Sequence, residues 1–244
     1  MDFLSFKQIF IEIFQKNQLD EYVKDDIIEK FFNLTCLMLE KNSVMNITAI
    51  KEIEKIIPLH YADCLKVAPY IPQGAKVIDI GCGGGFPSLP LAIVRPDVTI
   101  VGVDSTAKKV AYVAETAKTL GLDNLSTISA RAEELITMPQ MRESFDVVIS
   151  RAVARLHILD ELCLPFIKIG GKAIFMKGAA GNEELVEAES GIKKLGGDHI
   201  QIVEDDLWVT NDIKEVRVQI LIEKASNTPA QYPRQFGQIK KKPL

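Results

Sequence analysis

The chain has 244 residues, of which 47% are hydrophobic and 25% are charged, proportions typical of a globular protein with one large core. The formal net charge of −4 argues against a protein that coats itself with positive charge to hold nucleic acid, and no apolar run reaches the roughly 18 residues of a membrane span. The four cysteines and three histidines lack the spacing of a metal site, so we expect no metal and a reducing, cytoplasmic setting.

The N-terminal part of the sequence is predicted to be helical. Apolar residues between Phe6 and Phe14 recur at the spacing of one helix face, and a second amphipathic run covers about residues 20–40. A polar interruption at 41–48 is followed by more helical sequence. Prolines and a glycine at 69–74 then indicate a boundary, so we expect a helical extension over residues 1–72.

From residue 76 onward, short apolar runs alternate with helical stretches. This alternation is typical of a mostly parallel sheet with helices on both faces. The last two strands are close in sequence, and the final one partly alternates, so we expect an antiparallel hairpin at the edge of the sheet. The expected strands are 76–80, 99–103, 125–129, 145–150, 171–177, 199–204 and 213–223, and the expected helices are 87–94, 106–121, 132–137, 155–168 and 182–195.

A glycine-rich loop follows the first predicted strand. Phe86 stands where a dinucleotide fingerprint requires its third glycine, and no Lys-Ser or Lys-Thr follows as a phosphate loop requires. The spacing of Asp79, Gly81, Gly83 and Gly85 matches instead the loop of class I S-adenosylmethionine-dependent methyltransferases. Glycines let the backbone approach such a ligand, and a carboxylate can face its ammonium and sulfonium directly or through water. The alternative is a tight turn that holds no ligand.

Two further acidic positions extend this interpretation. Asp104 ends the next strand, about 20 residues beyond the loop, where a carboxylate can accept hydrogen bonds from both ribose hydroxyls; the alternative is an N-cap of the following helix. The segment 130–134 lies where this fold places its adenine loop, although Glu133 and Glu134 also suit a helix N-terminus. We therefore predict an α/β, Rossmann-like class I methyltransferase core over residues 73–224, mostly parallel with an antiparallel C-terminal hairpin.

Six short segments of the chain resemble segments of the bacterial RsmG (GidB) family and occur in the same order. This family methylates N7 of a guanine in 16S rRNA. The resemblance spans nearly the whole chain, and the segments outside the glycine loop make it specific. The loop departs from the family's usual sequence at Cys82 and Gly84. The six segments are Asn46–Thr48, Asp79–Pro87, Ser150–Ala154, Met176–Gly178, Tyr232–Gly237 and Lys241–Leu244.

The resemblance implies an enzyme that uses S-adenosylmethionine, yields S-adenosylhomocysteine, and acts on 16S rRNA or on the 30S subunit or its assembly intermediate. We expect no membrane partner and a monomer. Asn46, Arg151 and Lys177 would lie in or beside the reaction site. Asp79, Gly83 and Asp104 are considered above as cofactor contacts. The resemblance implies further cofactor contacts at Gly81, Phe86, Ala132, Glu133 and Arg151.

The chemistry of guanine N7 sets what these residues have to do. N7 carries a lone pair and no proton, so its methylation needs no general base and depends on orientation of the reactants. Lys177 and Arg151 suit donation to guanine O6 or to a phosphate. Arg151 could instead pair with Glu133 or Asp79, Lys177 could be merely solvated, and Asn46 could be a turn residue.

The C-terminal tail, residues 225–244, is predicted to contact RNA. From Lys224 onward the chain has five basic residues and no acidic one, which leaves a formal charge of −9 for the remainder. Contacts to phosphate would supply affinity, and solubilising charge is the alternative. We expect removal of 232–244 to weaken RNA binding and to spare S-adenosylmethionine binding. The predicted RNA-binding residues are Lys177, Arg234, Lys240, Lys241 and Lys242.

Two other functions remain open from the sequence. A class I methyltransferase can act on a small molecule or a protein, and transfer of labelled methyl to unmodified ribosomal RNA would distinguish the two substrates. A non-catalytic S-adenosylmethionine-binding module would be stabilised by S-adenosylhomocysteine without transferring a methyl group.

Overall fold

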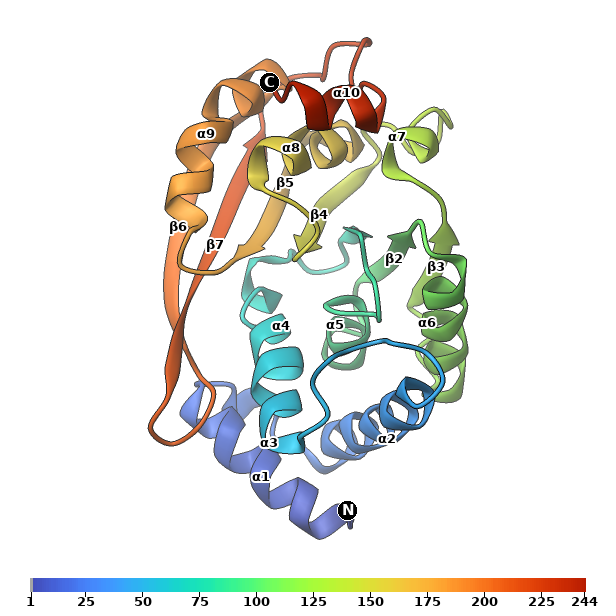
Figure 1. Cartoon of the computed structure of the whole chain (residues 1–244), viewed down its shortest axis with the longest axis vertical. Coiled ribbons are helices and arrows are strands. Elements are labelled where there is room, and N and C mark those ends of the chain that lie inside the picture. The colour runs from blue at the N-terminus through green and yellow to red at the C-terminus, as the bar shows by residue number, and fades with distance from the viewer. Residues whose placement is uncertain (1) are drawn as a thin grey trace.

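A seven-stranded sheet runs through the molecule with helices on both of its faces (Figure 1). The computed structural model describes residues 2–244. Its strands are β1 (Lys76–Ile80), β2 (Thr99–Asp104), β3 (Leu125–Ser129), β4 (Phe145–Arg151), β5 (Ile167–Lys177), β6 (Gly197–Trp208) and β7 (Lys214–Lys224). Their order is β3-β2-β1-β4-β5-β7-β6. The first five strands are parallel, whereas β7 is antiparallel to both β5 and β6, which confirms the predicted sheet with its C-terminal hairpin.

The helices form two layers with separate hydrophobic cores. The N-terminal helices, α5 and α6 bury one face of the sheet, and the helices from α7 onward bury the other. The helices of the first layer are α1 (Phe3–Lys16), α2 (Asp25–Asn42), α3 (Ile53–Ile56), α4 (Asp63–Leu65), α5 (Ser88–Val94) and α6 (Ala107–Thr119). Those of the second layer are α7 (Ala132–Leu135), α8 (Leu156–Cys163), α9 (Gly181–Lys194) and α10 (Phe236–Lys241).

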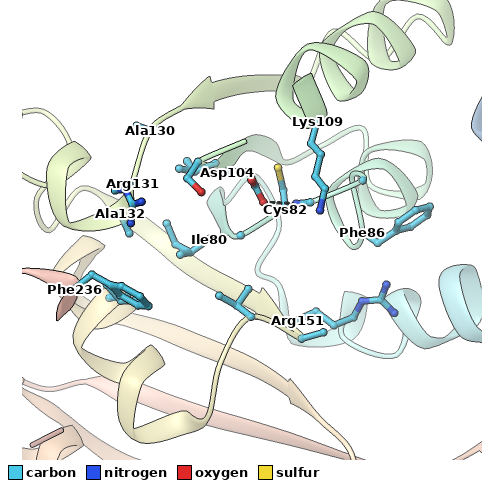
Figure 2. Close-up of a pocket in the computed structure, with 18 of the residues that line it drawn as sticks. Ile80, Cys82, Phe86, Asp104, Lys109, Ala130, Arg131, Ala132, Arg151 and Phe236 are labelled. Atoms are coloured by element: carbon cyan, nitrogen blue, oxygen red, sulfur yellow. Dashed lines mark hydrogen bonds between the residues drawn. The ribbon is translucent and has the colours of Figure 1, made fainter. Parts of the chain in front are cut away.

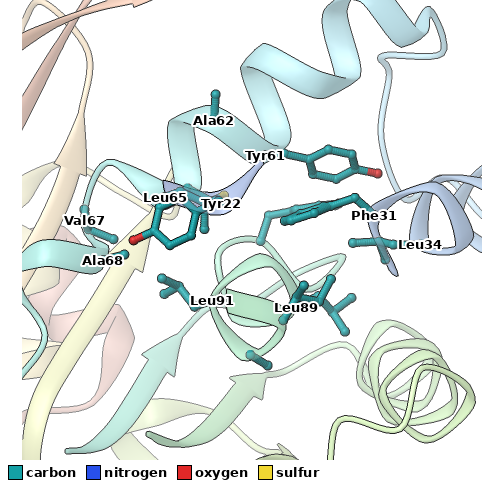
Figure 3. Close-up of a cluster of buried hydrophobic side chains, with 14 of the residues drawn as sticks. Tyr22, Phe31, Leu34, Tyr61, Ala62, Leu65, Val67, Ala68, Leu89 and Leu91 are labelled. Carbon is teal, nitrogen blue, oxygen red and sulfur yellow. The ribbon is translucent and has the colours of Figure 1, made fainter. Parts of the chain in front are cut away.

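Aromatic side chains attach the N-terminal helices to the core. Phe10 and Phe14, one turn apart on α1, stack with ring centroids 3.7 Å apart, and Phe31 of α2 packs against both. Figure 3 shows Phe31 and Tyr61 above Leu89 of α5. Each of these rings is fully buried, and such burial contributes about 1.5–3 kcal/mol per side chain. The N-terminal helices therefore share one core with the sheet, and the expected boundary at residue 72 stays a prediction.

A π-helical turn, η2 (Ile57–Ala62), connects α3 to α4. π-Helical turns insert an extra residue into the helix and are common at functional sites. Here the turn carries His60, whose ring stacks on Phe86 of the glycine loop with centroids 4.6 Å apart. The turn thus brings the N-terminal layer into contact with the carboxyl ends of the strands.

The predicted helix 155–168 is wrong at its C-terminal end. Helix α8 ends at Cys163, and a 3-10 turn, η4 (Leu164–Phe166), carries Pro165, which has no backbone N–H to continue a helix. Strand β5 begins directly afterwards, four residues earlier than expected, and is bulged near Gly170, where φ is +81°. Between residues 2 and 244, no helix is long and apolar enough to cross a membrane.

Candidate active site

The carboxyl ends of the central strands surround a cavity of about 460 Å³ (Figure 2). Ile80 lies at the end of β1, Asp104 at the end of β2 and Arg151 at the end of β4. Ligands of open α/β sheets bind outside the carboxyl ends of the strands, where the order of the strands reverses. Here the order reverses beside β1, so the cavity occupies the expected position.

The glycine loop forms the floor of this first cavity. The N–H groups of Gly81 and Cys82 donate to Val103 O at 2.8 and 2.9 Å, which ties the loop to β2. Gly83 has a φ of +54°, and a Cβ built there would meet, within 4 Å among the described residues, only Gly81 O at 3.9 Å. The backbone is therefore open to close approach by a ligand at this point.

Asp79 lies beneath the loop rather than in the cavity. Its carboxylate is 1% exposed and accepts a 2.5 Å hydrogen bond from Ser88 Oγ, which links β1 to α5. Its Oδ1 has no hydrogen-bond partner in residues 2–244, and burial raises the pKa of Asp79 to about 7. Asp79 is not among the described residues that line the cavity and supports the loop from below, so its contact with a cofactor, directly or through water, stays a prediction.

Asp104 lines the cavity and also organises its rim. Its two oxygens accept hydrogen bonds from Gly83 N at 3.0 Å and Thr106 N at 2.7 Å. Each carboxylate oxygen can accept a second bond, so both remain able to accept from hydroxyl groups of a ligand. Lys109 of α6 was not predicted, and Figure 2 shows its side chain extending from the helix toward the loop.

The end of the cavity beyond Asp104 is formed by the segment after β3. Ala130, Arg131, Ala132 and Glu133 line it, and the contact of the last two with a cofactor stays a prediction. The Glu133 side chain is 7% exposed and lies 3.9 Å from Arg131. Helices α8 and α10 complete this end with Leu162 and Phe236.

The opposite end is aromatic and cationic. Phe86 and His60 stack there, and the guanidinium of Arg151 lies 5.8 Å from the Phe86 ring centroid. Burial, with a smaller effect of Arg151, lowers the pKa of His60 to about 4, so the ring is neutral at pH 7. Arg151 Nη1 donates to Asp63 Oδ2 and to Leu59 O, both at 2.9 Å, and the pairing partner is therefore Asp63 rather than Glu133 or Asp79.

A second cavity of about 450 Å³ adjoins the first, and the two share Arg151, Ala152 and Val153. Lys177 Nζ reaches its wall and is held by Glu184 at 2.8 Å and Ala154 O at 2.7 Å. At the junction of the two cavities, Ala152 has a φ of +58°, a region that costs a residue with a Cβ about 1–2 kcal/mol.

An additional arginine completes the charge network of the second cavity. Arg217 of β7 donates through Nε to Asp63 Oδ1 at 2.8 Å, so Asp63 bridges two guanidinium groups. Three cations, Arg151, Lys177 and Arg217, are thus paired with three carboxylates, Asp63, Glu184 and Glu215. Lysine and arginine in a largely paired network are positioned to orient a polar substrate without excess charge.

Comparison with known proteins identifies the family. Residues 27–206 match the family described as "GidB: rRNA small subunit methyltransferase G". A Ribosomal RNA small subunit methyltransferase G of Clostridium novyi (strain NT) is 40% identical over 242 residues, covering 98% of each chain. One of Halalkalibacterium halodurans is 40% identical over 219 residues, covering 89% of this chain and 91% of the relative. The chain belongs to this family.

Solved structures resemble the fold of this methyltransferase. The YcgJ protein of Bacillus subtilis has a TM-score of 0.53 at 16% identity and covers 69% of this chain and all of its own. M. jannaschii TYW2, solved in complex with AdoMet, has a TM-score of 0.54 at 18% identity, covering 68% of this chain and 76% of its own. These likenesses confirm the class I methyltransferase fold, and the family match confirms the resemblance seen in the sequence.

Asn46 directly precedes Ile47, which lines the first cavity, and its place in or beside the reaction site stays a prediction. It is exposed in the loop between α2 and α3, and neither cavity has it among its described lining residues. Asn42 shapes this loop: its Oδ1 accepts from Ile47 N at 2.8 Å and from Thr48 N at 3.1 Å. Ile47 then covers the glycine loop and lines the first cavity.

The cations of the C-terminal part divide into two groups. Lys224 is the last residue of β7 and is buried, with Nζ 2.9 Å from Leu164 O. Arg234 pairs with Glu161, which is fully buried, at 2.6 Å, so its charge is offset within the protein and its contact with RNA stays a prediction. The residues that remain exposed and able to reach RNA are Lys240, Lys241 and Lys242.

Several site residues were missed in the sequence, and they differ in how they could have been found. Arg217 occupies a polar position in the alternation from Glu215 to Ile220 on β7, so its spacing indicates a strand with one polar face and no particular partner. Asp63 and His60 carry no signal of their role, because they lie in a mostly apolar helical segment whose pattern does not indicate a partner for either residue. Phe236 carries none either, because a single aromatic residue in a polar tail has no periodicity to interpret.

Proposed function

We propose that the protein transfers a methyl group from S-adenosylmethionine to N7 of a guanine in the 16S rRNA of the small ribosomal subunit. The observation that carries the proposal is the junction of two cavities at Arg151, Ala152 and Val153. One cavity has the features of a nucleoside site, and the other is bordered by donors suited to a guanine or a phosphate. Membership of the rRNA methyltransferase family supports the choice of RNA.

The residues of the first cavity suit S-adenosylmethionine. Gly83 offers an open backbone, Asp104 retains free acceptor capacity for ribose hydroxyls, and the small side chains of Ala130 and Ala132 leave room for a flat base. These residues would hold the methionine part, the ribose and the adenine, respectively. S-Adenosylmethionine supplies an electrophilic methyl group on a sulfonium when it is bound.

The reaction requires orientation more than proton transfer. The lone pair of guanine N7 forms the new bond to the methyl carbon as the sulfur–carbon bond breaks, and that bonding pair stays on sulfur. No proton is removed, so the protein has to align N7 with the methyl carbon, which contributes through proximity and orientation. Lys177 and Arg151 suit this task, because they donate hydrogen bonds and the Hoogsteen edge of guanine presents O6 as an acceptor beside N7.

The paired state of these cations suits the product. Methylation at N7 gives the base a positive charge, which unpaired lysine and arginine side chains would oppose. Asp63 and Glu184 lie 2.9 and 2.8 Å from Arg151 and Lys177, so they offset those charges. The network therefore donates hydrogen bonds to guanine while it adds little repulsion to a cationic base.

The decisive test is mapping of 7-methylguanosine in 16S rRNA. Unmodified 16S rRNA and 30S subunits are incubated separately with the protein and S-adenosylmethionine, and nuclease fragments are then analysed by mass spectrometry. We expect one guanine to gain the mass of one methylene group in at least one of the two substrates. Methylation at a position other than N7, or of neither substrate, would contradict the proposal.

Lys177→Met tests the role of the second cavity. We expect it to reduce methyl transfer by about 10²-fold, as loss of an orienting contact does, while S-adenosylhomocysteine affinity stays near that of the wild type. Lys168→Met is the matched control, because Lys168 lies on the same strand and is paired with Asp146 away from both cavities. Equal transfer rates for the two variants would exclude Lys177 from the site.

A further inference from the structure

We propose that the C-terminal segment, residues 225–244, forms part of the cofactor pocket, and that Phe236 is a positioning residue for the adenine of S-adenosylmethionine. This inference rests on the proposed function. It revises the expectation that removal of residues 232–244 would leave cofactor binding unchanged. The segment is held against the core by Arg142 and Glu161, and Phe236 lines the first cavity.

The segment is fixed to the core by several polar contacts. Arg142 donates to three of its backbone carbonyls, those of Tyr232 at 2.8 Å, Thr228 at 2.8 Å and Pro229 at 3.2 Å. Each of these carbonyls is thereby satisfied by a charged donor, and such bonds are stronger than neutral ones. The segment therefore follows the protein surface rather than extending from it as an arm.

A buried ion pair anchors the residues immediately before α10. The Glu161 carboxylate is fully buried in α8 and accepts from Arg234 N, Nε and Nη2 at 2.7, 2.9 and 2.6 Å. Three donors on one carboxylate leave little freedom to the backbone at Arg234. Ile239 of α10 is also fully buried in the core on this side of the sheet.

Phe236 is the residue that this anchoring brings to the cavity. It lies two positions after Arg234, packs on the second hydrophobic core, and lines the first cavity with Leu162 and Ala132. Figure 2 shows Phe236, Arg131 and Ala132 at the same end of the cavity, with Arg151 and Phe86 at the other.

The position of Phe236 identifies the part of the ligand that it meets. Asp104 lies between the two ends, and in nucleoside sites of this fold the acidic residue at the end of the second strand binds the ribose. The base then extends away from Arg151 toward Ala132 and Phe236. An aromatic ring at that place offers a purine an apolar surface. The purine can contact the ring either by offset stacking or edge to face, and both arrangements are favourable.

The other residues of the segment agree with this role. Lys224 and Arg234 are engaged inside the protein, so two of the five cations of this part of the chain are not available to phosphate groups. The segment therefore combines an internal half that ends at the cavity with an exposed half that carries Lys240, Lys241 and Lys242.

The test measures cofactor affinity in full-length protein by titration calorimetry with S-adenosylhomocysteine. We expect Phe236→Ala to bind about 10-fold more weakly, a change of about 1.4 kcal/mol. Phe236→Leu, which keeps an apolar side chain against Leu162, should lose nearly as much, and Phe236→Tyr should restore wild-type affinity. Lys241→Ala, on the exposed side of the same helix, should leave it unchanged.

Two further readouts separate contact with the base from general loss of structure. 5′-Methylthioadenosine contains the adenine and ribose but lacks the amino-acid part, and we expect the same fold loss for it as for S-adenosylhomocysteine. In the transfer assay, KM for S-adenosylmethionine should rise while kcat stays within about two-fold, because uniform binding is lost. Failure of the wild type to bind S-adenosylhomocysteine would overturn the proposed function itself. Wild-type binding with equal affinity in Phe236→Ala would overturn this inference alone.

Discussion

Replacement of Asp63 by asparagine is expected to be among the most destabilising single changes at the site. Its carboxylate is 8% exposed and accepts from Arg151 at 2.9 Å and from Arg217 at 2.8 Å, and those side chains are 17% and 15% exposed. An asparagine would point its amide N–H groups at one guanidinium, leave Arg151 without its carboxylate partner, and leave Arg217 paired with Glu215 alone, at 2.9 Å. Removal of one partner from a buried ion pair costs about 3–5 kcal/mol.

The lower end of that range applies to Asp63→Asn, because each arginine retains some access to water. A loss of about 3 kcal/mol lowers the melting temperature of a chain of this length by about 6–12 °C. Urea unfolding followed by circular dichroism measures the free energy, and methyl transfer should fall as well because Arg151 is no longer held. Asp25→Asn is the control: Asp25 pairs with Lys7 at 2.6 Å but is 85% exposed, so less than about 1 kcal/mol is expected. If both variants lose the same small amount, the bridge does not stabilise the protein and the reasoning is refuted.

Three other changes test the remaining features of the structure. Gly83→Val should reduce S-adenosylhomocysteine affinity at least about 10-fold by calorimetry, because its side chain occupies the open floor of the cavity. Burial raises the pKa of Asp160 from 3.8 to about 7, so the folded protein keeps a proton that the unfolded chain releases, and this group's contribution to stability falls as pH rises through that window. Asp160→Asn should therefore remove a negative slope of up to about 1.4 kcal/mol per pH unit from urea unfolding measured between pH 5 and 7. Joint replacement of Lys240, Lys241 and Lys242 by alanine should weaken RNA binding and reduce its salt slope by about 2, with S-adenosylhomocysteine affinity unchanged.

Each of these three predictions has an outcome that would contradict it. Gly121→Val is the control for Gly83→Val, since Gly121 has a φ of +65° and open space around its Cα but lies outside the cavity. A loss of affinity in both would assign the effect to backbone strain. An unchanged pH slope in Asp160→Asn would mean that Asp160 is ionised in the folded protein. An unchanged salt slope after removal of the three lysines would leave the exposed half of α10 without a role in RNA binding.

Periodicity and glycine spacing predicted the parts of the molecule that local sequence determines. The strand that ends at Ile80 and the loop from Gly81 onward are contiguous, so their place in the fold follows from local sequence, whereas the burial of Asp79 beneath the loop does not. The antiparallel end of the sheet was also predictable, because two strands with a short connection pair with each other. Pro165 offered a signal that was missed, since a proline inside a predicted helix marks its end.

The remainder depended on contacts between distant segments. Arg151 had two candidate partners in the sequence, Glu133 and Asp79, and the structure supplied a third, Asp63, which is 88 residues away along the chain. The sequence placed Arg234 among the basic residues of the tail, and nothing in it indicated the ion pair with Glu161 that the structure shows. Partner choice of this kind is decided by how helices pack on the sheet, and no pattern within either segment contains that information.

The contact between η2 and the strand ends limits how the protein can change over evolution. Asp63 and His60 belong to the N-terminal layer, whereas Arg151, Arg217 and Phe86 belong to the sheet and its loops. A chimera that joins the helices of one relative to the sheet of another therefore exchanges half of an ion-pair network. Such a hybrid should work only when the acid at 63 and the flat ring at 60 are transferred with their partners, so these positions are expected to vary together among functional chains.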